Sequence, residues 1–134
     1  MSKSYSFPGF IDVHVHFRDP GVPEAETTAS GLAAAARGGF AAVVTMPNTT
    51  PACDSPEQLQ YQQVAAGNST HQPTNPSTYK PTNPPTHQPP LLLPSACITK
   101  GRLGHEVANL EVLAEAGAAF FTDDGSYVAD DKVM

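Results

Sequence analysis

The feature that most constrains the fold is the alternation of short apolar runs with longer helical segments. Strand-like runs occupy residues 10–17, 40–46, 91–99 and 118–122, and helical segments lie between them. The run at 40–46, "FAAVVTM", is apolar on both faces, which is typical of a strand in a parallel sheet covered by helices. The sequence therefore predicts an α/β fold with about four βα units and parallel strands.

Helices are expected over about residues 24–37, 56–66 and 106–116. Each is followed by glycine, at Gly38-Gly39, Gly67 and Gly117, and glycine readily takes the left-handed conformation that closes a helix. The stretch "SPEQ" at 55–58 offers an N-cap serine, a proline at the first helical position and a glutamine at the third. This pattern predicts a capping box at the start of the second helix.

A proline-rich segment at 67–90 interrupts the alternation. "HQPTNPST", "YKPTNPPT" and "HQPP" form an imperfect eight-residue repeat that holds half of the 14 prolines of the chain. Proline lacks the backbone donor that helices and central strands need, so we expect a disordered insertion or linker of polyproline character. A proline-rich docking peptide is the alternative. The predicted organisation is thus 1–66 and 91–134 on either side of a linker at 67–90.

Composition excludes several classes of protein. The net charge of −6, without a basic patch, argues against a nucleic-acid partner. The sequence has no run of about 18 apolar residues, the length that would predict a membrane span. The start of the chain lacks the apolar core of a signal peptide. Cys53 and Cys97 have no metal-ligand spacing and are expected to be free, buried thiols of a cytoplasmic protein.

The run "PGFIDVHVHFRDPG" at 8–21 carries a polar residue at every second position, from Asp12 through His14 and His16 to Arg18. In a strand these four side chains would share one face, and the apolar residues between them would share the other. Two imidazoles about 6.6 Å apart along a strand can converge on one ion. An exposed edge strand and a pair of core histidines are the alternatives that this pattern leaves open.

Further polar residues follow the other predicted strands. Asn48 lies just beyond the second strand in "MPNT", and Asp123 and Asp124 lie beyond the fourth in "TDDG". Functional sites of parallel α/β folds form at the carboxyl ends of the strands. Two histidines and a carboxylate there would suit a hydrolytic metal site, in which the metal lowers the pKa of a bound water to near 7. A simple turn is the alternative for "DDG".

The motifs "PGFIDVHVHFRDPG", "AAARGGFAAVVTMPNT", "LPSACITKG" and "FFTDDG" together resemble those of class I dihydroorotases of the amidohydrolase superfamily, in the same order. The resemblance implies a TIM-type (β/α)8 barrel. It also implies zinc-dependent, reversible cyclisation of N-carbamoyl-L-aspartate to L-dihydroorotate in de novo pyrimidine (UMP) biosynthesis. Arg18 and the aspartate pair favour this family over allantoinases and dihydropyrimidinases, the alternative within the superfamily, which usually place a carboxylated lysine on the fourth strand.

The same resemblance assigns roles by motif. His14, His16 and Asp124 would be ligands of one or two zinc ions, with Asp124 shared between two metals. His16, Arg18 and Asn48 would contact the substrate, and the last two would hold its carboxylate, a role suited to a guanidinium fork.

The resemblance also implies eight strands, of which this chain supplies about four. The aspartate that acts as general acid/base is expected in the missing half, so no catalytic residue is assigned here and the chain alone is expected to be inactive. Exposed strand edges predict self-association. The alternative function is that of a non-catalytic, dihydroorotase-like partner of aspartate carbamoyltransferase.

Overall fold

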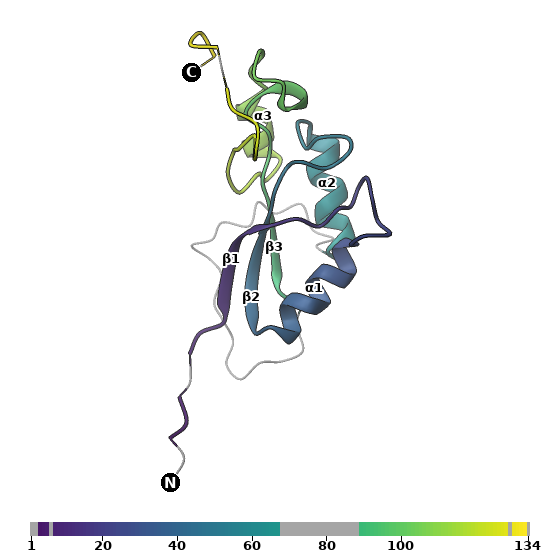
Figure 1. The fold of residues 1–134 in the computed structure, drawn as a ribbon, viewed down its shortest axis with the longest axis vertical. Helices are drawn as coiled ribbons and strands as arrows, with labels where there is room; N and C mark the ends of the chain where they lie inside the picture. Colours follow the sequence, from purple (N-terminus) through teal and green to yellow (C-terminus); the bar gives the residue numbers. More distant parts are fainter. Residues whose placement is uncertain (1–2, 6, 68–88, 129, 134) are drawn as a thin grey trace.

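A computed structural model describes residues 3–5, 7–67, 89–128 and 130–133. Strands and helices alternate along the chain, which confirms the α/β class (Figure 1). The strands form one parallel sheet in the order β1-β2-β3. The elements are β1 (Phe10–Val15), α1 (Thr28–Arg37), β2 (Phe40–Thr45), α2 (Pro56–Ala65), β3 (Leu91–Pro94), the 3-10 turn η2 (Lys100–Arg102) and α3 (Leu110–Glu115).

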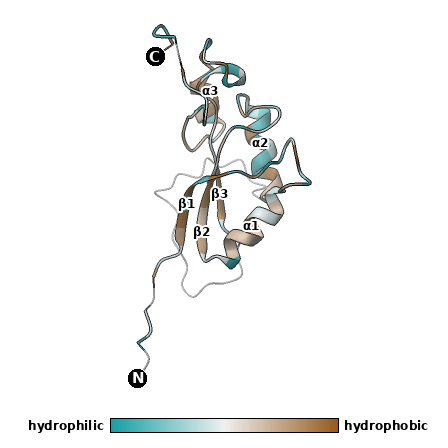
Figure 2. Cartoon of the chain, viewed as in Figure 1, coloured by the Kyte–Doolittle hydropathy of each residue, from teal (hydrophilic) through white to brown (hydrophobic). Residues whose placement is uncertain are grey.

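The helix α1 packs on the sheet through one apolar cluster. Leu32 of α1 contacts Val43 of β2 and Leu92 of β3, together with Phe17 from the loop after β1. Gly31 makes this approach feasible, because a Cβ there would lie 2.3 Å from the Phe17 ring. Figure 2 shows the strands mostly in hydrophobic colours and α2 mostly in hydrophilic ones. The sheet therefore supplies much of the apolar surface that the helices cover.

A second cluster lies where α2, α3 and the chain after β3 meet. It contains the buried residues Cys53, Leu59, Ala96, Ala108 and Leu113. Both cysteines of the chain are free and buried, as expected from the sequence. Because this cluster fixes residues 95–99 against α3, it also fixes the segment that leads into the predicted fourth strand.

The fourth strand is shorter than predicted. Instead of a strand over 118–122, the structure has one parallel bridge between Ala96 and Phe121. The amide of Ala96 donates to the carbonyl of Phe120, and the amide of Thr122 donates to the carbonyl of Ala96, both at 3.0 Å. The segment therefore lies beside the extension of β3, as a fourth parallel strand would, but it pairs over too few residues to count as one.

The starts of α1 and α3 differ from the prediction, whereas α2 begins at Pro56 as predicted. Helix α1 begins at Thr28, since Thr27 and Ser30 form a reciprocal capping box at 3.0 Å. The box predicted at Ser55 is wrong: Ser55 precedes α2 and proline opens the helix, but the serine makes no side-chain cap. Helix α3 begins at Leu110, where Asn109 accepts from the amide of Val112.

The predicted glycine stops are confirmed. Gly39 and Gly117 follow α1 and α3 with φ of 80° and 96°, a backbone conformation that other residues adopt only at a cost. Residues 68–88, which hold most of the proline-rich repeat, lie outside the described residues, so the linker at 67–90 and the division into three segments stay predictions. Within the described parts of the chain, no helix is long and apolar enough to cross a membrane.

Candidate metal centre

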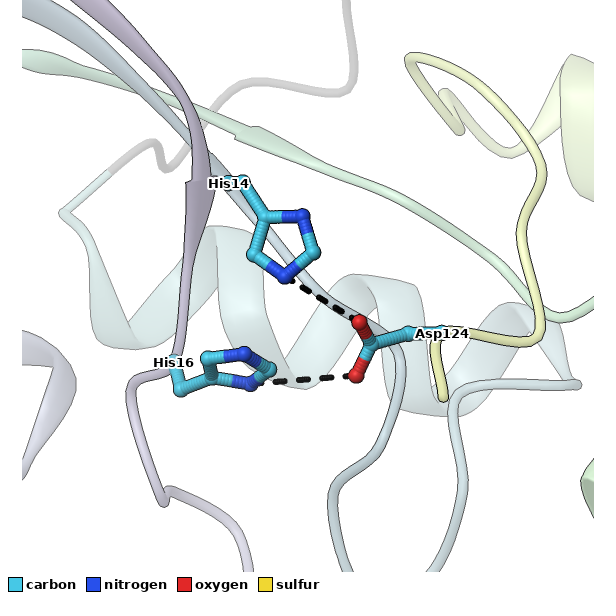
Figure 3. A group of neighbouring side chains, drawn as sticks. All are labelled: His14, His16 and Asp124. Carbon is cyan, nitrogen blue, oxygen red and sulfur yellow. Dashed lines mark ion pairs between the residues drawn. The ribbon is translucent and has the colours of Figure 1, made fainter. Parts of the chain in front are cut away.

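The predicted ligands from opposite ends of the chain meet in space. His14 comes from β1, and His16 follows that strand. Asp124 lies in the turn after residues 118–122, the fourth segment (Figure 3). The Nε2 of His14 is 3.1 Å from Oδ1 of Asp124, and the Nδ1 of His16 is 4.0 Å from Oδ2. One ligand atom of each residue lies within 4.8 Å of the others. The carboxylate thus faces both imidazoles, 110 positions away along the chain from His14.

These three side chains fit a divalent metal in their chemistry and spacing. Imidazole nitrogen and carboxylate oxygen are the ligands that zinc takes in hydrolytic sites. Ligand atoms 2.0–2.1 Å from a tetrahedral ion lie about 3.3 Å from each other. The observed separations of 3.1 and 4.0 Å lie on either side of that value. The arrangement could therefore hold an ion after small side-chain adjustments.

An irregularity in β1 changes which of its side chains point to the same side of the sheet. Asp12 pairs with Val43 but Val15 pairs with Thr45, so β1 has one residue more than β2 between these points. Since paired residues point to the same side of a sheet, Asp12 and Val15 both face the helices, as Val43 does. The register thus puts Asp12 on the helix side of the sheet, and it assigns no partner to His14. The carboxylate of Asp12 accepts from the amide of His14 at 3.0 Å.

Three apolar side chains of β1 are largely exposed. Phe10, Ile11 and Val13 are 62%, 62% and 63% exposed. In the described sheet β1 pairs only with β2, so its other edge carries unpaired backbone groups. This edge is where a further strand could add.

Asn48 lies close to the histidine pair. Its Oδ1 is 2.9 Å from the Nδ1 of His16, although the two residues come from the ends of different strands. This same Nδ1 is the nitrogen that lies 4.0 Å from Oδ2 of Asp124, so the ring edge that faces the carboxylate also contacts Asn48. Arg18 is exposed in the loop after β1, and its guanidinium makes no hydrogen bond or ion pair with any described residue.

The two adjacent aspartates have different surroundings. Asp123 is 3% exposed, and its carboxylate accepts from the amides of Ile98 and Thr99 at 2.9 and 3.0 Å and from the Thr99 hydroxyl. Asp123 therefore joins the end of the fourth segment to residues 98 and 99, which follow β3. Asp124 alone reaches the histidines. The strand pattern predicted both aspartates at this edge, and the resemblance named Asp124 as the ligand; the contacts of Asp123 come from the structure alone.

Sequence reasoning missed Arg102. Its Nε donates to the carbonyl of Asp123 at 2.9 Å, and its Nη2 donates to the carbonyl of Asp124 and contacts Oγ of Ser126 at 3.4 Å. An isolated arginine in "ITKGRLG" has no periodic or spacing signal. Only the contact with a segment some 20 residues away identifies it.

The two thiols are poor candidates for ligands. Burial, with a smaller contribution from the charge of Asp54, raises the pKa of Cys53 to about 12. Burial likewise raises the pKa of Cys97 to about 12, with a smaller contribution from Cys53. Because metals bind thiolates, both side chains behave near neutral pH as small apolar groups.

Comparisons with known proteins show which family the chain resembles. Residues 5–80 match the family described as Dihydro-orotase-like. The chain is 43% identical over 118 residues to the dihydroorotase of Bacillus subtilis (strain 168), covering 88% of this chain and 23% of that protein. It is 41% identical over 134 residues to the dihydroorotase of Carboxydothermus hydrogenoformans, covering 100% of this chain and 27% of that protein.

A third relative, the dihydroorotase of a Sulfurihydrogenibium species (strain YO3AOP1), is 41% identical over 127 residues, which cover 95% of this chain and 26% of that protein. The chain thus spans about a quarter of the length of the curated relatives that it matches. The family match covers more than half of the chain, and the relatives agree with it. This chain therefore belongs to the dihydro-orotase-like family.

Proposed function

We propose that this chain carries part of the active site of a zinc-dependent dihydroorotase. The observation that carries the proposal is the convergence of His14, His16 and Asp124 at the carboxyl ends of parallel strands. The reaction is the reversible cyclisation of N-carbamoyl-L-aspartate to L-dihydroorotate, a step of de novo pyrimidine biosynthesis that belongs in the cytoplasm. The family and the relatives' names support this choice of substrate.

The three side chains would hold one or two zinc ions, with Asp124 able to offer one oxygen to each. When bound, zinc supplies Lewis acidity, which polarises a carbonyl and makes water a stronger nucleophile near neutral pH. The protein's own share is to hold its ligands in one orientation. The contact of Asn48 with Nδ1 of His16 orients that ring beside Asp124.

His16, Arg18 and Asn48 would also bind the substrate. N-carbamoyl-L-aspartate and dihydroorotate carry carboxylates, and the exposed guanidinium of Arg18 can form a bidentate pair with one of them. Asn48 can offer its amide nitrogen while its oxygen contacts His16. With these contacts, the charged end of the substrate would lie beside the histidine pair.

The remaining parts of the site would come from further chain of the eight-stranded barrel, including the carboxylate that acts as general acid/base. We therefore propose that the 134-residue chain alone has little or no activity. The exposed edge of β1 favours association with additional strands or with a second copy. The segments 1–66 and 91–134 would form the βα units, and 67–90 would be an insertion between them.

A chimaera tests the proposal directly. The aligned segment of the B. subtilis dihydroorotase would be replaced by this chain, and hydrolysis of L-dihydroorotate would be measured with added zinc. We expect activity in the chimaera and a loss of at least about 100-fold in its His14→Ala variant, because a metal ligand is removed. His105→Ala is the matched control, since that histidine is exposed and lies outside the group.

Different results point to different corrections. A folded, zinc-loaded chimaera that hydrolyses allantoin or dihydrouracil but not dihydroorotate would move the substrate to that branch of the superfamily. Equal activity of the His14→Ala and parent chimaeras would refute the metal site. Metal-free binding of the 134-residue chain to aspartate carbamoyltransferase would instead support the non-catalytic partner.

A further inference from the structure

The backbone around Asp124 is held in an unusual conformation. Its φ is 25°, in the region of positive φ that residues other than glycine seldom adopt. Aspartate tolerates this region better than most residues, but the conformation lasts only where surrounding contacts impose it. The carboxylate of this same residue reaches both histidines, so the backbone conformation and the ligand position are linked.

The contacts that impose this conformation come from both sides of the peptide. The amide of Asp124 donates to the hydroxyl of Thr122 at 3.1 Å. Its carbonyl accepts from Nη2 of Arg102, while Nε of the same guanidinium donates to the carbonyl of Asp123 at 2.9 Å. One planar, charged group thus fixes two successive carbonyls, which a single-point donor could not do.

Arg102 is itself firmly held at the end of η2. Its own φ is 61°, and its amide donates to the carbonyl of Thr99 at 3.0 Å. The preceding Gly101 donates its amide to the carboxylate of Asp54 at 2.7 Å. The hydroxyl of Thr99 accepts from the amide of Gly104 at 2.9 Å. The guanidinium is therefore anchored on a braced turn rather than on a free loop.

We propose that Arg102 is a positioning residue for the metal centre. Its guanidinium holds the turn after the fourth segment so that the carboxylate of Asp124 meets His14 and His16. Without this fork the turn would relax toward ordinary negative φ, and the carboxylate would move away from the imidazoles. The inference rests on the proposed metal site. It adds that the loop after β3 controls the position of Asp124.

Two measurements on the purified 134-residue chain test the inference. Cobalt(II) titration, followed by the visible absorption of the bound ion, gives the affinity and ligand geometry. Hydrogen exchange of the Asp124 amide in metal-free protein reports the turn without any metal. The variants are Arg102→Ala and Arg102→Lys, which keeps the charge but not the fork. The matched control is Arg37→Ala on the exposed end of α1, with the same change in charge.

We expect both Arg102 variants to bind cobalt about 10- to 100-fold more weakly, as is typical when the support of a ligand is lost. We also expect faster exchange at Asp124 and unchanged values in Arg37→Ala. If Arg102→Ala does not fold, Arg102→Lys decides, because it keeps the side-chain stem. Affinity and exchange equal to the parent chain in a folded Arg102 variant would overturn the inference. A parent chain that binds no cobalt would refute the proposed metal site instead, and exchange at Asp124 would still judge the role of Arg102.

Discussion

The adjacent aspartates provide a sharp test of the site. Asp123 is buried and accepts three hydrogen bonds, whereas Asp124 faces the histidines. In the metal-free protein, Asp123→Asn should therefore lower the free energy of unfolding, and Asp124→Asn should change it little. In cobalt titrations the order should reverse, because the ligand is lost only in Asp124→Asn.

The magnitude for Asp123→Asn follows from its contacts. The amide oxygen can still accept from the amides of Ile98 and Thr99, but each bond loses the strengthening that a charged acceptor gives. The amide nitrogen replaces the oxygen that accepts from the Thr99 hydroxyl, which leaves that donor without its partner. Together these losses cost about 2–3 kcal/mol.

Urea unfolding followed by far-ultraviolet circular dichroism measures this cost. With a slope of about 1–3 kcal/mol/M, the midpoint of Asp123→Asn should fall by about 0.7–3 M. Equal midpoints for Asp123→Asn and the parent chain would refute the structural role of Asp123. A loss of cobalt binding in folded Asp123→Asn, with normal binding in Asp124→Asn, would show that the ligand assignment is reversed.

Four further predictions concern the centre, the core and the caps. His14→Ala should abolish the rise in melting temperature that added zinc is expected to produce, and it should leave the melting temperature of the metal-free protein unchanged. A rise equal to that of the parent chain would contradict the role of His14 as a ligand. Gly31→Ala should cost about 1–3 kcal/mol in urea unfolding, because its Cβ would overlap the ring of Phe17; a gain in stability would mean that the ring moves freely. Thr27→Ala should cost about 1 kcal/mol by the same assay through loss of the capping box, whereas an unchanged midpoint would mean that the box contributes nothing. Burial raises the pKa of Cys53 from 9.0 to about 12, so the folded state binds that proton more tightly than the unfolded chain. The contribution of Cys53 to stability should be full below pH 9 and be lost by about 1.4 kcal/mol per pH unit as the pH rises toward 12; Cys53→Ala should remove this part of the slope in urea unfolding at each pH.

The sequence determined the features that depend on local patterns. The alternation of apolar runs and helical segments indicated the α/β class, and the glycines marked where the helices end. The placement of His14, His16 and Asp124 at strand ends was also predictable, because parallel strands bring their carboxyl ends to the same edge. The motifs indicated the family, which the comparisons confirm.

Only the tertiary structure decided the details that depend on distant partners. The extra residue in β1 puts Asp12 and Val15 on the same side of the sheet, and strand register is set by pairing with β2 rather than by the alternation itself. The identical side chains of Asp123 and Asp124 differ because one meets the amides at 98 and 99 and the other meets the histidines. Arg102 gains its place through two carbonyls that lie some 20 residues further along the chain. Local sequence encodes periodicity and caps, whereas a hydrogen bond between distant segments exists only once the chain has folded.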